Sequence, residues 1–168
     1  MNLLSKLGLL ILLGAIACNN TAKQQPASDS ASQISIANMK LLDLNGQVVD
    51  FSQYKGKTVF INFWATWCKP CREEMPSIQK AMEILKNENI QFLFPSEESN
   101  DEIEVFKAAH GYNFNFVRVE SLAELNIIGL PITFIFNPDG KLVFSEMGYR
   151  KWDDKANIDL IQSISNPK

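Results

Sequence analysis

The chain of 168 residues has no excess of basic charge, with 16 lysines and arginines against 19 aspartates and glutamates and a formal net charge of −3. Binding to nucleic-acid phosphates needs a basic patch, and no run of like charges stands out along the sequence. The composition therefore argues against nucleic acid as a partner. Its 46% of hydrophobic and 21% of charged residues are ordinary for a globular protein with a buried core, and the length suits one domain with a short appendage.

Histidine and cysteine are scarce as well: the chain has one histidine, His110, and three cysteines, Cys18, Cys68 and Cys71. A structural zinc ion needs four ligands. Cys18 belongs to a polar segment outside the folded part, so only His110 remains to join the other two cysteines. We therefore expect no metal and no other cofactor. His110 precedes Gly111 near the predicted end of a helix, and we interpret it as a surface or capping residue.

Long hydrophobic runs are also missing, since the apolar segment near the N-terminus covers only residues 7–17. A helix of this length spans about 16 Å, against about 30 Å for the hydrocarbon core of a bilayer. The segment follows Lys6 and ends in the small residues Ala15 and Ala17, which is the pattern of a secretory signal peptide. We predict a signal peptide over residues 1–17.

Cys18 stands directly after this segment, where two processing routes would cut the same bond. Ala15 and Ala17 suit an ordinary signal peptidase, while the segment also resembles the lipobox of bacterial lipoproteins, with Ala15 where leucine is usual. A lipid would explain why a cysteine is present, because a free N-terminal thiol in an oxidising compartment would form stray disulfides. We predict that Cys18 is lipidated and that residues 18–37 form a flexible tether to a membrane, with a mean reach of about 25 Å.

From residue 38 to 168 the pattern is that of one folded domain. Alternating and β-branched runs predict strands, and apolar residues at helical spacing predict helices. Pro76 lies inside the longest predicted helix, so we expect a kink there. The predicted elements are a hairpin over 41–51 around Asn45-Gly46, strand 58–65, helix 68–87, strand 90–94, helix 101–110, strand 116–119, helix 121–126, a hairpin over 132–145 and helix 153–164. A central sheet with helices on both faces accommodates this order.

Cys68 and Cys71 lie at the start of a predicted helix that follows a buried strand, where they can close a small reversible disulfide. A helix N-terminus stabilises an anion, and Lys69 and Arg72 add positive charge, so the first thiol is predicted to ionise readily. The thiolate is the nucleophile of disulfide exchange. We therefore expect Cys68 to attack the substrate disulfide and Cys71 to resolve the mixed disulfide. A purely structural bridge would close too short a loop to stabilise much.

The residues around this pair resemble the active-site segment of thioredoxins, and most closely that of the membrane-tethered TlpA/ResA-like group of bacterial thiol–disulfide oxidoreductases. The resemblance covers about residues 38–165 and is carried by Asn62-Phe63-Trp64-Ala65-Thr66-Trp67-Cys68-Lys69-Pro70-Cys71 and by Gly129-Leu130-Pro131-Ile132-Thr133-Phe134. It implies an α/β protein of thioredoxin fold, with a central mixed sheet flanked by helices and an N-terminal hairpin extension.

The resemblance also implies roles for residues beside the cysteines. Pro131 matches the family's cis-proline loop, so it is expected to be cis and to face the disulfide, with the backbone of Leu130 pairing with substrate. A trans proline that opens a strand would also be permissible at this position. Trp67, Lys69 and Pro70 complete the expected substrate-binding set.

The proton acceptor for the resolving cysteine departs from the thioredoxin pattern. Thioredoxins have a buried aspartate where this chain has Asn62, which cannot titrate, and some TlpA/ResA-like members use a glutamate after the next strand instead. That position suggests Glu98 ahead of Glu97, because a carboxyl in a partly apolar pocket has a raised pKa and can carry a proton. The alternative is a solvated pair that caps the next helix. Pro95 also departs from the family pattern.

We thus expect an envelope oxidoreductase on the periplasmic side that reduces disulfides of exported proteins, drawing electrons from a membrane donor. The resemblance also suggests cytochrome c biogenesis as its setting. The direction of electron flow does not follow from the residues between the cysteines. Two alternatives remain: a peroxidase of peroxiredoxin type, which favours a lone cysteine in a Thr/Pro-rich context, and a copper-binding assembly factor, which uses a wider cysteine pair and a later histidine.

Overall fold

The computed structural model describes residues 35–167. The predicted signal peptide, the lipidated Cys18 and nearly all of the tether lie outside the described residues. Within the described part, no helix combines the length and the apolar character needed to cross a membrane.

A mixed sheet of six strands forms the centre of the domain, in the order β1-β4-β3-β2-β5-β6. β2 is parallel to β3, and β3 to β4, while the other neighbours are antiparallel. All six residues of β2 are buried, which confirms the predicted central strand. The strands are β1 Leu41–Leu42, β2 Thr58–Phe63, β3 Ile90–Ser96, β4 Phe116–Val119, β5 Ile132–Phe136 and β6 Leu142–Met147.

Three α-helices connect or follow these strands: α1 Lys69–Ile84, α2 Asn100–His110 and α3 Lys155–Ser165. α1 runs through Pro76 as one assigned helix. α2 begins with a capping box, in which Ser99 and Glu102 bond each other's backbone, and it ends at Gly111 with φ 64° in the left-handed region that glycine adopts easily. Short 3-10 helices are η2 Ile36–Asn38, η3 Phe51–Tyr54 and η4 Ala123–Leu125.

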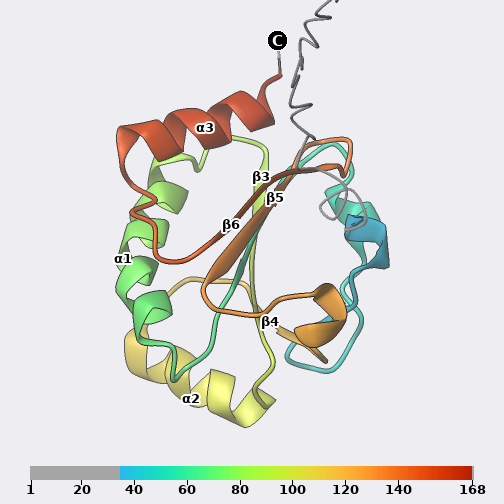
Figure 1. The fold of residues 1–168 in the computed structure, drawn as a ribbon, viewed down its shortest axis with the longest axis vertical. Helices are drawn as coiled ribbons and strands as arrows, with labels where there is room; N and C mark the ends of the chain where they lie inside the picture. The colour runs from blue at the N-terminus through green and yellow to red at the C-terminus, as the bar shows by residue number, and fades with distance from the viewer. Residues whose placement is uncertain (1–34, 168) are drawn as a thin grey trace, which may run out of the picture.

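The two faces of the sheet carry different cores, because side chains alternate along each strand. On β2, Phe60 joins one core and Ile61 the other. All three α-helices contribute to the first core, through residues such as Ile78, Ile103 and Ile161. Segments that include η3 and η4 cover the second core. Figure 1 shows this division, with α1, α2 and α3 on one side and the blue N-terminal segment on the other. Helices flank both faces as expected, but among residues 35–167 the helices on the second face are 3-10 helices and the three α-helices pack on the first.

The N-terminal hairpin is smaller than the sequence predicts. Its Asn45-Gly46 turn is present, and the Asp43 carboxylate accepts hydrogen bonds from the backbone of Asn45 and Gln47 at 2.9 and 2.8 Å. Strand pairing across it is limited to one bridge, between Leu42 and Val48. The predicted second arm stops early because Asp50 caps η3, and β1 pairs with β4 instead. The predicted helix over 121–126 is likewise only the 3-10 turn η4.

Candidate active site

The disulfide lies where β2 gives way to α1. Cys68 is the N-cap residue of α1, and Cys71 lies in the first turn, with 5.3 Å between their Cα atoms. The backbone N–H of Cys71 donates to Cys68 Sγ at 3.3 Å. This amide and the helix N-terminus would stabilise a thiolate on Cys68 once the bridge is reduced. Cys68 is 4% exposed and Cys71 is fully buried, so of the two residues Cys68 is the nearer to the surface.

The rim of the site combines exposed and apolar groups. Trp67, next to Cys68, is 72% exposed, whereas Trp64 is buried in the core. The Leu130–Pro131 peptide is cis, which confirms the predicted isomer of this bond. Lys69 forms an ion pair with Glu73 at 3.4 Å, so its charge is partly compensated. A hollow of about 280 Å³ lies beside the disulfide and is lined by Trp64, Ala65, Trp67, Ser96, Glu97, Glu98, Leu122 and Leu130.

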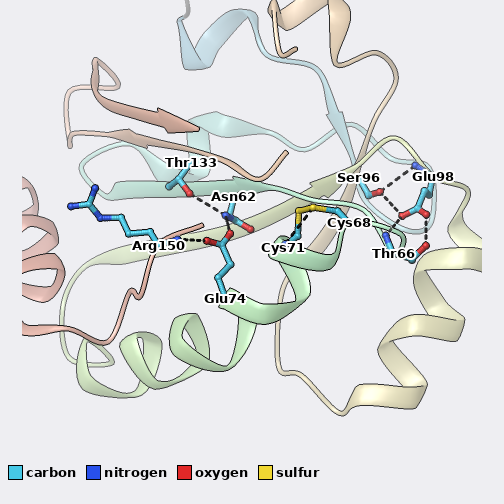
Figure 2. Close-up of a disulfide and its surroundings, with 9 residues drawn as sticks. All are labelled: Asn62, Thr66, Cys68, Cys71, Glu74, Ser96, Glu98, Thr133 and Arg150. Carbon is cyan, nitrogen blue, oxygen red and sulfur yellow. Dashed lines mark hydrogen bonds between the residues drawn. A yellow bond between two sulfur atoms is a disulfide. The ribbon is translucent and has the colours of Figure 1, made fainter. Parts of the chain in front are cut away.

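Glu98 holds the loop that carries Trp67. Its carboxylate accepts hydrogen bonds from Thr66, through the backbone N–H at 2.7 Å and through the hydroxyl, and from Ser96 Oγ at 3.0 Å (Figure 2). Arg118 Nε donates to the Glu98 carbonyl at 3.0 Å. β3 continues through Pro95 to Ser96, two residues past the predicted end at residue 94. This longer strand places Glu98 next to Thr66. The proton-transfer role of Glu98 stays a prediction. Its observed hydrogen bonds hold the loop at Thr66 in place.

A second carboxyl, Glu74, lies on the other side of the disulfide and was missed by the sequence analysis. It is fully buried on α1, three residues after Cys71 and therefore on the same face of the helix (Figure 2). Asn62 Nδ2 donates to its carboxylate at 2.7 Å, and the backbone N–H of Arg150 donates at 3.0 Å. Asn62 also bonds Thr133 Oγ1 at 3.0 Å. The network therefore joins β2, α1, β5 and the loop before α3 behind the active site.

Burial raises the pKa of Glu74 from 4.5 to about 7, because the charged form loses hydration, and the hydrogen bonds from Asn62 and Arg150 offset only part of this. No cationic side chain pairs with this carboxylate within residues 35–167. The signal in the sequence was its spacing: Glu74 falls in the buried stripe of Cys71, Met75 and Ile78. A carboxyl that titrates near neutral pH beside Cys71, the predicted resolving cysteine, can accept or donate a proton during exchange.

His110 is the last residue of α2, and its Nδ1 lies 2.8 Å from the carbonyl oxygen of Phe106 while its ring stacks on that residue at 4.0 Å. The contact is that of an exposed residue at a helix end, as interpreted from the sequence. Within residues 35–167, no group of three or more His, Cys, Asp and Glu side chains is placed to hold a metal ion.

Comparison with known proteins agrees with this geometry. A model of the AhpC/TSA family matches residues 33–145. "Thiol-disulfide oxidoreductase ResA" of Bacillus subtilis (strain 168) is 34% identical over 140 residues, which cover 80% of this chain and 78% of the relative. The protein of the same name from Geobacillus kaustophilus (strain HTA426) is 36% identical over 106 residues, 61% of each chain.

Solved structures with low sequence identity show the same fold. A thiol:disulfide interchange protein of the thioredoxin family from Chlorobium tepidum TLS superposes with a TM-score of 0.62 at 21% identity, covering 74% of this chain and 91% of that one. The exposed lipoprotein thioredoxin Etrx1 of Streptococcus pneumoniae strain TIGR4 superposes with a TM-score of 0.60 at 21% identity, covering 74% and 97%. These likenesses show a thioredoxin fold, as predicted.

Proposed function

Because the chain belongs to the AhpC/TSA family and is a thiol–disulfide oxidoreductase of thioredoxin fold, we propose that it reduces disulfides of exported proteins through the Cys68–Cys71 pair. The observation that carries this proposal is the redox pair itself. Cys68 caps α1 with an N–H directed at its sulfur, and Cys71 lies within bonding distance one turn later.

This geometry supports the following reaction. The Cys68 thiolate attacks a substrate disulfide, forms a mixed disulfide and releases one substrate thiolate. The Cys71 thiolate then attacks Cys68 Sγ, releases the second substrate thiolate and closes the Cys68–Cys71 bridge. The substrate gains two electrons and the protein loses two. A membrane-bound dithiol donor would reduce the bridge again, and the potentials of donor, protein and substrate set the direction.

Substrate binding is proposed for the groups that surround Cys68. Trp67 offers an exposed ring, and Lys69 and Pro70 lie at the open end of α1. The Pro131 carbonyl is engaged by the N–H of Gly148 at 2.8 Å, whereas the backbone of Leu130 has no hydrogen-bond partner among residues 35–167. An extended substrate segment can therefore pair with Leu130 beside the disulfide, in the manner of strand addition.

A peroxidase is the second function to test, since the matching family model carries the AhpC/TSA description. Reduced full-length protein should be oxidised rapidly by oxidised insulin, with one substrate disulfide reduced for each Cys68–Cys71 bridge formed, and only slowly by hydrogen peroxide. The measurement is stopped-flow tryptophan fluorescence with both oxidants. Faster oxidation by peroxide than by the disulfide would contradict the proposal and favour the peroxidase.

We further propose that the protein works in the bacterial cell envelope, held at the membrane by a lipid on Cys18, and that cytochrome c biogenesis is one setting that supplies such substrates. Its support is the apolar segment before Cys18 and the polar composition after it. Protein extracted from membranes should begin at Cys18 and carry the added mass of acyl chains in intact-mass spectrometry. A soluble product that begins with unmodified Cys18 would show that an ordinary signal peptidase cuts the chain.

A further inference from the structure

A second, larger cavity lies at the end of the sheet away from the disulfide. It measures about 960 Å³ and lies between η3, the segment around η2 and the turn between β5 and β6. Val59 belongs to its lining, and β2 runs from there toward Trp64 and the active site. Six residues of strand extend about 20 Å, so the cavity is separate from the site of exchange. Its apolar lining includes Ile36, Met39, Val48, Val49, Phe51 and Val59.

The lysines without an ion pair gather around this cavity. Six of the ten lysines among residues 35–167 pair with a carboxylate, and the four that do not are Lys40, Lys55, Lys57 and Lys141. The first three line the cavity, and Lys141 follows Gly140, which also lines it. Two aspartates are part of the lining, and one of them, Asp50, is occupied in capping η3.

The chain enters the domain at the same end. Ser35, the first described residue, forms a bridge with Lys141, and Ile36 contributes to the cavity lining. If Cys18 holds the protein at a membrane, the 16 residues from 19 to 34 separate the anchor from this end. A random-coil chain of 16 residues would have a mean reach of about 20 Å. The lysine-rich end would then face the lipid surface, and the disulfide at the far end of β2 would face away from it.

We propose that this end of the domain, formed by the apolar cavity and Lys40, Lys55, Lys57 and Lys141, docks on a bilayer that contains anionic phospholipid. The inference rests on the proposed lipid anchor. The lysines would lie among the lipid phosphates, and Val48, which is 71% exposed at the cavity rim, would enter the headgroup region with the cavity beneath it. A mixed apolar and basic surface is the combination that binds such interfaces.

Hydrogen exchange on the full chain in vesicles tests the proposal. With phosphatidylglycerol mixed into phosphatidylcholine, amides of residues 47–56 should exchange more slowly than in phosphatidylcholine alone, and raised salt should remove the difference. The double variant Lys40→Gln/Lys55→Gln should weaken docking about 25-fold, because each lysine near an anionic surface contributes about a fivefold factor. Lys86→Gln/Lys155→Gln, which removes one ion-paired lysine just after α1 and another at the start of α3, is the matched control and should dock like the parent.

Three outcomes would overturn the proposal. Equal protection of these amides in vesicles with and without phosphatidylglycerol would show that anionic lipid is not required for docking. Protection of residues 47–56 in the absence of vesicles would show that another segment of this chain or a second copy of it occupies the cavity. A Lys40→Gln/Lys55→Gln variant that docks like the parent would show that these lysines do not contribute to membrane binding. The rate of thiol–disulfide exchange with oxidised insulin, measured on the same variants, should equal that of the parent. A loss of docking is therefore distinguishable from a failure of the proposed function.

Discussion

Replacing Cys68 by serine should lower disulfide exchange by about 10³-fold or more, because the thiolate is the nucleophile and a serine hydroxyl stays protonated at neutral pH. Replacing Cys71 by serine should have a different effect. Cys68 then still attacks, but nothing resolves the product, and the substrate remains attached as a mixed disulfide. The difference follows from placement: Cys68 caps α1 and keeps a small exposed fraction of 4%, while Cys71 is fully buried.

Non-reducing electrophoresis and mass spectrometry of each variant with oxidised insulin measure both effects. Cys18→Ser is the control, since it removes the third cysteine and should leave the exchange rate with this soluble substrate unchanged. Limiting iodoacetamide on the reduced parent should modify Cys68 first. A stable adduct with substrate in the Cys68→Ser variant, or preferential alkylation of Cys71, would reverse the two roles.

The sequence was sufficient for the redox pair and for the strands that enclose it. β2, β4 and β5 are runs of β-branched and aromatic residues, whose pattern reports burial directly. The cis peptide before Pro131 came from a resemblance in sequence, because no local rule distinguishes it from a trans proline that opens a strand. β3 was predicted too short, since Pro95 reads as a strand end. In the structure Pro95 remains within β3, where it pairs with Val117 on β4 and its carbonyl accepts from Trp64 N–H at 3.1 Å.

Glu74 was missed for a physical reason. In the sequence it follows Arg72 and Glu73, which makes it look like part of a solvated helix face. Its burial depends on Asn62 in β2 and on the backbone of Arg150, which is 76 residues later. Its spacing from Cys71 and Ile78 places Glu74 on the inward face of the helix, but its distant polar partners cannot be read from local periodicity. The sequence pointed instead to Glu98, whose carboxylate bonds Thr66 and Ser96 in the structure.

Glu74 should make the oxidised protein less stable as the pH rises. Its pKa is about 7 in the folded state against 4.5 for an ordinary glutamate, so the folded protein binds this proton more tightly than the unfolded chain. The stabilisation is complete below pH 4.5 and is lost as the pH rises through 7. Each pKa unit corresponds to 1.36 kcal/mol, so the loss amounts to about 3 kcal/mol of unfolding free energy.

Denaturant unfolding of the oxidised protein between pH 4.5 and pH 8 measures this effect. Glu74→Gln cannot titrate, so the difference in unfolding free energy between parent and variant should change by about 3 kcal/mol across that range, in the direction that disfavours the parent at high pH. Glu73→Gln, which removes an exposed carboxyl from the same helix, is the matched control and should keep the parent's slope. A Glu74→Gln variant with the parent's slope would contradict the raised pKa.

The same carboxyl should govern resolution of the mixed disulfide. Cys71 must lose its proton while buried, and an ionised Glu74 on the same face of α1 is placed to take it. Glu74→Gln should therefore slow resolution by about 10²-fold and remove the step near pH 7 from its pH profile. Glu98→Gln, measured in parallel, separates the two carboxyls: a changed profile in that variant alone would assign the proton to Glu98. If both profiles overlay the parent's, neither carboxyl carries the proton, and ordered water is the better candidate.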